Sequence, residues 1–138
     1  LVVGSVNIDY TIYVDEFPRV GETLIGKNKI ASLGGKGVNQ AIASLNSGGD
    51  VTFLCFLGQD DIASQIKQQL KKYNVNSCIE EIAALSSGNA FIFVDSHSQN
   101  EIVVVSGANY VLDTTLLTKH EDLFNKLNIL FCKTKSIL

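Results

Sequence analysis

Runs of mostly apolar residues predict strands that lie inside a sheet. Segments 1–6, 51–57 and 127–132 are of this kind, each about the length of one strand. Continuous apolar runs of this length are typical of strands buried on both faces of a parallel sheet. We therefore expect three core strands there, with Asn7 and Asp9 at the carboxyl end of the first.

Other segments mix β-branched and aromatic residues with polar ones, which predicts strands with one exposed face. They cover residues 10–16, 22–33, 89–95 and 101–106. The last two are joined by a short polar stretch, so we expect them to form a hairpin. Together the four segments predict a small antiparallel flap beside the core sheet.

Helical spacing of apolar residues follows two of the core strands. Val38, Ala41, Ile42 and Leu45 recur at i, i+3, i+4 and i+7, which predicts a helix from about 38 to 47. Two further helices are expected, one capped by Asp60 or Asp61 and bearing Ile62, Ile66, Leu70 and Tyr73, and one capped by Asp113 and bearing Leu116, Leu117, Leu123 and Phe124. Alternation of strands and helices predicts one α/β domain over residues 1–138, with a mostly parallel sheet.

Composition narrows the class of protein. A net charge of −3 argues against a nucleic-acid partner, and no apolar run approaches the length of about 20 residues that spans a membrane. Three cysteines are an odd number without metal-binding spacing, and Cys55 and Cys132 lie in apolar runs where a thiol is expected to be buried. We expect a mildly acidic cytoplasmic protein.

The stretch SLGGKGVNQA at residues 32–41 is the strongest local signal of function. Gly34, Gly35 and Gly37 suit a backbone that approaches another group closely, and the helix start offers free N–H groups to an oxygen-rich or anionic ligand. Neither of the two standard nucleotide loops fits, because the Walker pattern and the dinucleotide fingerprint both fail at their required glycines. A flexible surface turn with a solvated lysine at Lys36 is the alternative.

Three amide or carboxylate side chains favour a hydroxylated ligand over that alternative. Asn39 lies in the first helical turn, off the apolar stripe, and Asn7 and Asp9 follow a strand. An amide both donates and accepts hydrogen bonds, and open α/β sheets bind ligands at the carboxyl ends of their strands. The residues therefore predict a polyol site.

Five motifs in order make the chain similar to a known family. They are GSVNID at 4–9, PRVGETLIG at 18–26, GGKGVNQA at 34–41, LGQDDIA at 57–63 and VVVSGAN at 103–109. The set resembles the N-terminal motifs of the ribokinase group of PfkB-type carbohydrate kinases and covers nearly the whole chain. The resemblance implies a Rossmann-like ribokinase fold with a small β-sheet lid, of which the C-terminal half is absent here.

The same resemblance implies the chemistry. Such a kinase moves the γ-phosphoryl group of MgATP to the 5-hydroxyl of ribose, with a monovalent cation such as K⁺ expected in the complete protein. By the same resemblance, the substrate-binding residues are Asn7, Asp9, Gly35, Lys36, Asn39, Ala90, Ile92 and Val104. The last three would line the lid over the sugar, and the lid would also form the contact of a homodimer.

Catalytic, ATP-binding and cation-binding residues are expected in the absent half. The chain contains no methionine and begins with Leu1, so we expect it to be a fragment or a trimmed product that is inactive alone. Lys135 falls where the family has a glutamate that contacts the sugar. Asn89 replaces a small apolar residue, and we expect its side chain to face solvent. A fructokinase or nucleoside kinase relative and a non-catalytic binding or dimerisation module remain alternatives.

The remaining polar candidates are assigned structural positions. Asp60, Asp61, Asp95 and Asp113 lie in cap or turn contexts, and His97 and His120 have no acidic or nucleophilic neighbour at a mechanistic spacing. We expect both histidines at the surface or at the edge of the core.

Overall fold

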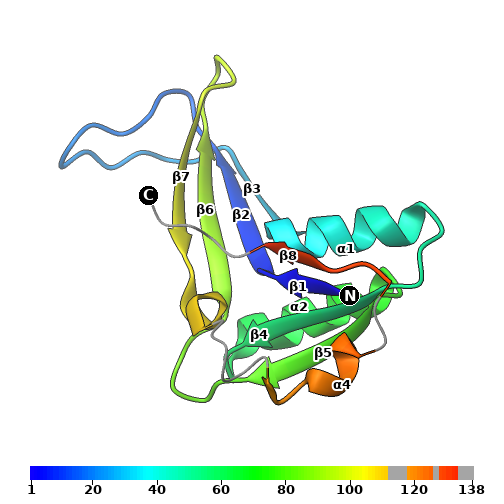
Figure 1. The fold of residues 1–138 in the computed structure, drawn as a ribbon. Helices are drawn as coiled ribbons and strands as arrows, with labels where there is room; N and C mark the ends of the chain where they lie inside the picture. The colour runs from blue at the N-terminus through cyan, green and yellow to red at the C-terminus, as the bar shows by residue number, and fades with distance from the viewer. Residues whose placement is uncertain (112–117, 126–127, 134–138) are drawn as a thin grey trace.

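Two sheets divide the part of the chain that the computed structural model describes, which is residues 1–111, 118–125 and 128–133 (Figure 1). Sheet A has the strand order β5-β4-β1-β8, and all its neighbouring strands are parallel. Its strands are β1 (Val2–Gly4), β4 (Thr52–Leu57), β5 (Asn76–Glu81) and β8 (Phe131–Lys133). The parallel core sheet expected from the apolar runs is therefore present.

Sheet B is a mixed sheet that rises from one end of sheet A (Figure 1). Its strands are β2 (Asn7–Tyr13), β3 (Asn28–Gly34), β6 (Gly88–Val94) and β7 (Asn100–Val105), in the order β3-β2-β6-β7. The outer pairs are antiparallel, whereas β2 and β6 pair in parallel at the centre. The β6–β7 hairpin is as expected, but the flap is not purely antiparallel.

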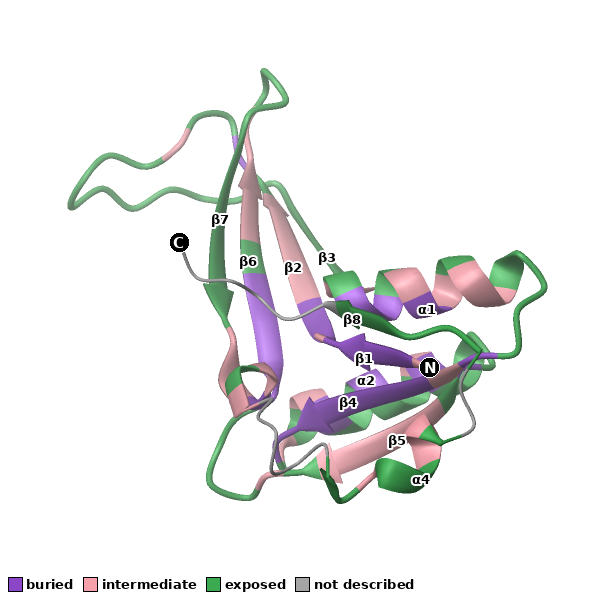
Figure 2. Ribbon diagram, viewed as in Figure 1, coloured by how far each residue is buried: buried purple, intermediate pink, exposed green. Residues whose placement is uncertain are grey.

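Helices cover both faces of sheet A. The helices α1 (Lys36–Asn46) and α2 (Asp61–Lys72) pack on one face, where Val38, Ala41 and Ile66 join side chains of β1 and β4 in one core cluster. The 3₁₀ helix η1 (Gly107–Val111) and α4 (Glu121–Phe124) pack on the other face. Figure 2 shows β1 and β4 almost wholly buried between these layers, whereas β7 is exposed along its length.

The strand expected over residues 22–33 was too long. Residues 22–27 form no strand, and β3 begins at Asn28. The side chain of Ile25 is 94% exposed, so it has no neighbour to pack against. Apolar character alone does not make a strand when nothing covers it.

Other boundaries also moved. The first core strand ends at Gly4 rather than residue 6, and the chain then crosses into sheet B, so β2 begins at Asn7 instead of residue 10. Asn7 and Asp9 therefore lie inside the strand that follows β1, and not at the end of β1 itself. The last core strand is confined to residues 131–133 within the described part of the chain.

The strand β5 was missed because its sequence NSCIEE ends in two glutamates and has no strong β-pattern. It is the edge strand of sheet A, where one polar face is tolerated. Asp113, Leu116 and Leu117 of the expected third helix lie outside the described residues. Cys132 is exposed and not buried, because it lies on the edge strand β8, whereas Cys55 is buried as expected.

Within the described residues, no helix has the length and hydropathy required to cross a membrane.

Candidate functional site

The crossing from β1 to β2 places polar and apolar side chains on one face of sheet B. Asp9 of β2 is paired with Ala90 of β6, which is in turn paired with Val104 of β7. Ile92 and Asn7 are each two residues along their strands, so alternation puts them on the same face. Ala90 is buried, Ile92 is half-buried and Val104 is exposed. The five side chains form one surface with polar residues at its base.

The Asp9 carboxyl group is the least satisfied polar group of this surface. Its Oδ1 atom is buried and has no hydrogen-bond partner among the described residues. Burial raises the pKa of Asp9 above its ordinary value, and the polar contact with the Asn7 side chain offsets part of this rise. A buried carboxylate oxygen without a donor is a ready acceptor for a ligand hydroxyl group.

Asn7 is fixed at the base of the same surface. Its side chain is 9% exposed, and its Oδ1 atom accepts a hydrogen bond of 2.8 Å from Asn109 Nδ2. Asn109 belongs to η1, 102 residues further along the chain. Asn109 lies within the VVVSGAN motif, and nothing in the sequence indicates this contact, because only the fold brings the two residues together.

The glycines of the 34–37 loop contact the chain itself. A Cβ atom on Gly35 would lie 2.6 Å from Ser5 O, and one on Gly37 would lie 2.6 Å from the Gly4 carbonyl carbon. Gly35 also has a φ of 108°, which side chains rarely allow. The idea that these glycines exist to wrap a ligand is thus incomplete, since they first let α1 approach the β1–β2 crossing.

Gly34 joins this loop to the polar surface. A Cβ atom on Gly34 would lie 1.9 Å from Asp9 Oδ2, so only glycine leaves room for the carboxyl group. The first helical turn follows directly, and Val38 N donates to Ser5 O at 3.1 Å. Lys36 and Asn39 of that turn are exposed and three residues apart, which places them on adjacent positions of the helix surface.

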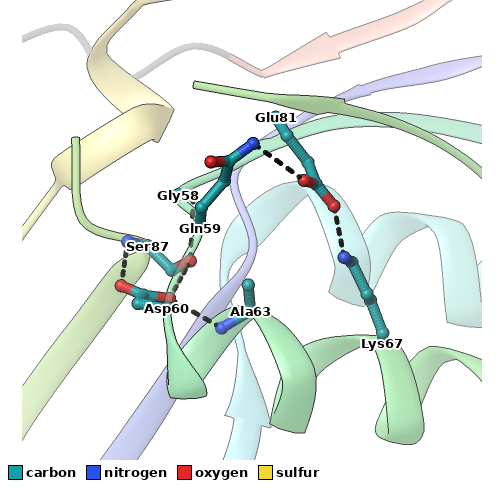
Figure 3. A network of polar contacts seen from close by, with 7 residues as sticks. All are labelled: Gly58, Gln59, Asp60, Ala63, Lys67, Glu81 and Ser87. Atoms are coloured by element: carbon teal, nitrogen blue, oxygen red, sulfur yellow. Dashed lines mark hydrogen bonds and ion pairs between the residues drawn. The ribbon is translucent and has the colours of Figure 1, made fainter. Parts of the chain in front are cut away.

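A second polar network fixes the other side of the junction between the sheets (Figure 3). Of the two candidates Asp60 and Asp61, Asp60 caps α2 by accepting from Ala63 N at 2.8 Å. Its carboxylate also accepts from Ser87 N at 2.8 Å and from Ser87 Oγ at 2.7 Å. Ser87 Oγ in turn accepts from Gly58 N at 3.0 Å. Because Ser87 directly precedes β6, this network ties the start of α2 to the base of sheet B.

Two expectations about isolated residues need correction. His120 does have an acidic neighbour: its Nε2 atom lies 2.9 Å from Glu80 Oε1, and its Nδ1 atom lies 3.6 Å from Cys78 Sγ. The sequence gave no sign of this because the contact joins the N-cap residue of α4 to β5. Asn89, which could have faced solvent, is buried at 8% exposure on the other face of sheet B from Asp9.

His97 has an acidic neighbour too, because its Nδ1 atom lies 3.7 Å from Asp95 Oδ2. Asp95 itself lies in a turn, as expected. Asp95 accepts hydrogen bonds from His97 N and Gln99 N, both at 2.9 Å, within the turn between β6 and β7. Cys55 is buried, and burial raises the pKa of its thiol to about 12. Among the described residues, no group of three or more His, Cys, Asp or Glu side chains could hold a metal ion. Lys135 lies outside the described residues.

An α/β core with a parallel sheet and a second sheet at its edge defines the class of fold, and comparison with known proteins identifies the family. The model of the pfkB family carbohydrate kinases matches residues 1–138. The chain belongs to the PfkB family of carbohydrate kinases.

Individual relatives agree with this assignment. The chain is 37% identical over 121 residues to a ribokinase of Haemophilus influenzae, covering 87% of this chain and 40% of that protein. The structure of a ribokinase from Giardia lamblia has a TM-score of 0.84 at 31% identity, covering 95% of this chain and 40% of that one.

A third comparison includes bound ligands. The structure of an Arabidopsis thaliana ribokinase complexed with ribose and ATP has a TM-score of 0.71 at 28% identity, with 85% of this chain and 40% of that one covered. The expected ribokinase fold is therefore confirmed. The chain spans about 40% of the length of the proteins that it matches.

Proposed function

We propose that the complete protein transfers the γ-phosphoryl group of MgATP to the 5-hydroxyl of D-ribose, and that this chain supplies the sugar-binding half. The observation that carries the proposal is the buried, unpartnered Asp9 Oδ1 atom on the polar base of the sheet B surface. Sugars offer several hydroxyl donors and an apolar ring face. A lone carboxylate oxygen beside Ala90 suits such a ligand.

Each residue of the surface then has a role. Asp9 accepts hydrogen bonds from sugar hydroxyls, and Asn7 donates to a neighbouring sugar oxygen. Lys36 and Asn39 hold the sugar from the start of α1, and Gly35 lets that helix start lie close to the ligand. Ile92 and Val104, with Ala90, contact the apolar face of the ring from sheet B.

Sheet B acts as the lid in this proposal. Its closure over the sugar excludes water, which would otherwise compete with the sugar hydroxyl for the phosphoryl group. ATP, Mg²⁺ and a monovalent cation such as K⁺ are bound by the remainder of the protein.

The assembly and location are part of the same proposal. The exposed side chains of Val103 and Val105 lie on the face of β7 opposite to Val104. They form an apolar surface that suits contact with a second copy through sheet B. We propose a cytoplasmic homodimer. A fructokinase or nucleoside kinase with the same fold is the alternative for the substrate, and a non-catalytic sugar-binding module is the alternative for the role.

The test is an assay of the complete protein with MgATP and a panel of acceptors. D-ribose, 2-deoxy-D-ribose, D-fructose and adenosine are compared at equal concentrations, and the phosphorylated product is identified by mass spectrometry and NMR. We expect turnover with D-ribose to have the highest kcat/KM, with phosphate on the 5-hydroxyl. Preference for fructose or adenosine would transfer the assignment to that substrate.

Two variants connect activity with the surface. Asp9→Asn should lower kcat/KM for D-ribose by at least about tenfold, since a charged hydrogen-bond acceptor is lost. Asp61→Asn, which changes an exposed carboxyl group at the start of α2, should leave it unchanged. Equal activity of the two variants would contradict the role of Asp9, and no turnover of any acceptor would favour the non-catalytic module.

A further inference from the structure

The orientation of the Asn109 carboxamide is fixed by the backbone of Val6. Asn109 Oδ1 accepts from Val6 N at 3.0 Å, and Asn109 Nδ2 donates to Val6 O at 3.0 Å. A backbone N–H can only donate and a backbone carbonyl can only accept. In the reversed orientation the Asn109 amino group would face the Val6 N–H and the Asn109 oxygen would face the Val6 carbonyl. Only the observed orientation therefore satisfies both hydrogen bonds.

This orientation determines that of Asn7. The second N–H of Asn109 Nδ2 points at the Asn7 side chain, in which only the amide oxygen can accept a hydrogen bond. The contact of 2.8 Å therefore involves Asn7 Oδ1. With its oxygen engaged, Asn7 presents its amino group as a donor to the side of the site, where the Asp9 carboxylate lies two residues further along the strand.

Gly88 leaves the space for this arrangement. A Cβ atom there would lie 2.1 Å from Asn109 Nδ2 and 2.3 Å from Asn7 Oδ1. The first residue of β6 is thus free of a side chain at the place where the hydrogen bond passes. Three segments, the β1–β2 crossing, the start of β6 and η1, converge on one amide.

We propose that Asn109 is a positioning residue, which does not touch the sugar but holds Asn7 with its amino group directed as a donor toward Asp9 and the ligand. This inference rests on the proposed function of the surface as a sugar site. Without Asn109, the Asn7 amide could turn over and place its oxygen beside the Asp9 carboxylate. The two acceptors would repel each other, and a sugar oxygen would lose its donor.

Because few polar groups surround Asp9, the pH at which it titrates should report whether Asn7 directs its amino group toward it. Asp9 is paired with Ser32 of β3 and with Ala90 of β6, and it touches the backbone of Gly34. These groups are uncharged. The first positively charged residue after Gly34 in the sequence is Lys36. Loss of the Asn7 donor should therefore make the carboxylate less stable and raise the pH at which Asp9 titrates.

The first experiment is a carboxyl-carbon NMR titration of the complete protein, with the Asp9 signal assigned by its loss in Asp9→Asn. Asn109→Ser retains a hydroxyl group for the Val6 backbone but is too short to reach Asn7. We expect Asp9 to titrate at higher pH in this variant than in the wild type. Gly88→Ala should produce the same change from a different residue, because its methyl group would occupy the path of the hydrogen bond.

A control variant shows whether the change in the Asp9 titration is specific to Asn109 or follows from the replacement of any hydrogen-bonded asparagine. Asn76 Nδ2 donates to Thr52 Oγ1 at 3.1 Å at the opposite end of the sheet A strands. Asn76→Ser should leave the Asp9 titration unchanged. Should Asn109→Ser fail to fold, Gly88→Ala carries the test alone.

The second experiment asks whether the effect reaches the substrate. Asn109→Ser should raise the KM for D-ribose about tenfold, with a smaller change in kcat, as expected for one lost hydrogen bond to a ligand. In an Asn7→Ala background the same substitution should change KM by less than about twofold, because a residue that acts through Asn7 has nothing left to position. A residue with only a structural role would give equal effects in both backgrounds.

An Asp9 titration that is the same in wild type, Asn109→Ser and Gly88→Ala, with all three folded, would overturn the proposal. Equal effects of Asn109→Ser on KM with and without Asn7 would overturn it as well. If the wild type phosphorylates no sugar, the proposed function fails, but a raised Asp9 titration in the two variants would still support the positioning role. The two failures are therefore distinguishable.

Discussion

The surroundings of the Asp9 carboxyl group stabilise its charged form less well than water does. Burial raises its pKa, and the contact with Asn7 only partly offsets the rise. The side chain is thus retained at a cost to folding, as is common for groups that bind ligands. Replacement by asparagine removes the charge and keeps the shape.

We predict that Asp9→Asn increases the free energy of unfolding at neutral pH while it removes sugar binding. A carboxyl group with a raised folded-state pKa destabilises the fold above that pKa, and the destabilisation disappears as the pH falls through it. The variant and the wild type should therefore differ in stability at pH 7 and converge at low pH. Urea unfolding of both proteins across this range measures the difference.

The same ionisation predicts the pH dependence of binding. The sugar hydroxyls donate to the charged carboxylate, so affinity for D-ribose should fall as the pH drops through the raised pKa of Asp9.

For the stability prediction, an Asp9→Asn variant that is less stable than the wild type at pH 7 would contradict the destabilising role of the Asp9 carboxylate. Asp61→Asn is the control, because Asp61 is exposed.

At this scale the sequence named residues that the fold brings to one face of sheet B. The strand register brings Asn7, Asp9, Ala90 and Val104 to one face, and their role in sugar binding stays a prediction. Asn109 was assigned no role, because its hydrogen bonds to Val6 and Asn7 span more than a hundred residues. Local pattern contains no information on such a contact.

At the scale of elements, the starts of α1 and α2 fix the junction between the two sheets. The helix α1 begins without a side-chain cap, and Gly35 and Gly37 instead allow it to pack against the β1–β2 crossing. The helix α2 begins with Asp60, which also bonds to Ser87 at the base of β6. The start of α1 depends on the absence of side chains at two glycines, whereas the start of α2 depends on the Asp60 carboxylate.

We predict that Asp60→Ala lowers the free energy of unfolding by about 1–2 kcal/mol at neutral pH, since it removes a helix cap and the bonds from Ser87. Partial burial alone raises the pKa of Asp60, but the hydrogen bonds from Ser87 and Ala63 outweigh it and leave the pKa lowered. The contribution is therefore complete above the ordinary pKa of about 4 and is lost as the pH falls through the lowered value.

Urea unfolding at neutral and acid pH checks this prediction, with Asp61→Ala as the matched control. Asp61 lies in the first turn of α2 but does not cap it. A loss of stability that is equal for the two variants, or one that persists unchanged at low pH, would contradict the role of the Asp60 carboxylate.

Boundaries of elements were less predictable than their existence. The pattern of apolar residues indicated α1, α2 and most strands, and Asp60 was one of the two residues predicted to cap α2. The same pattern placed the start of the β3 segment at residue 22 instead of Asn28. Ile25 is apolar, but whether it is covered depends on tertiary neighbours that the sequence does not show. The pattern also missed β5, whose glutamates are tolerated only at the edge of a sheet.

At the scale of the whole molecule, two sheets with different surroundings share one junction. Sheet A is covered on both faces, whereas sheet B leaves apolar side chains of β7 exposed. Val103 is 59% exposed on the outermost strand of sheet B. Exposed apolar surface of this kind favours association with another molecule.

We predict that Val103→Lys shifts the complete protein from dimer toward monomer, because a lysine would have to be desolvated in the contact between two copies. Sedimentation velocity at micromolar concentration measures the shift. Tyr73→Lys changes another exposed side chain, at the end of α2, and should leave the dimer intact. A wild-type protein that is monomeric at these concentrations would contradict the dimer.

The central claim is that the polar base of the sheet B surface binds a pentose through Asp9. Isothermal titration of the complete protein with D-ribose, in parallel with Asp9→Asn and Asp61→Asn, tests it most directly. The account predicts saturable binding by the wild type and Asp61→Asn, and a loss of affinity of at least about tenfold in Asp9→Asn. Equal affinity of all three proteins, or no binding by the wild type, would contradict it.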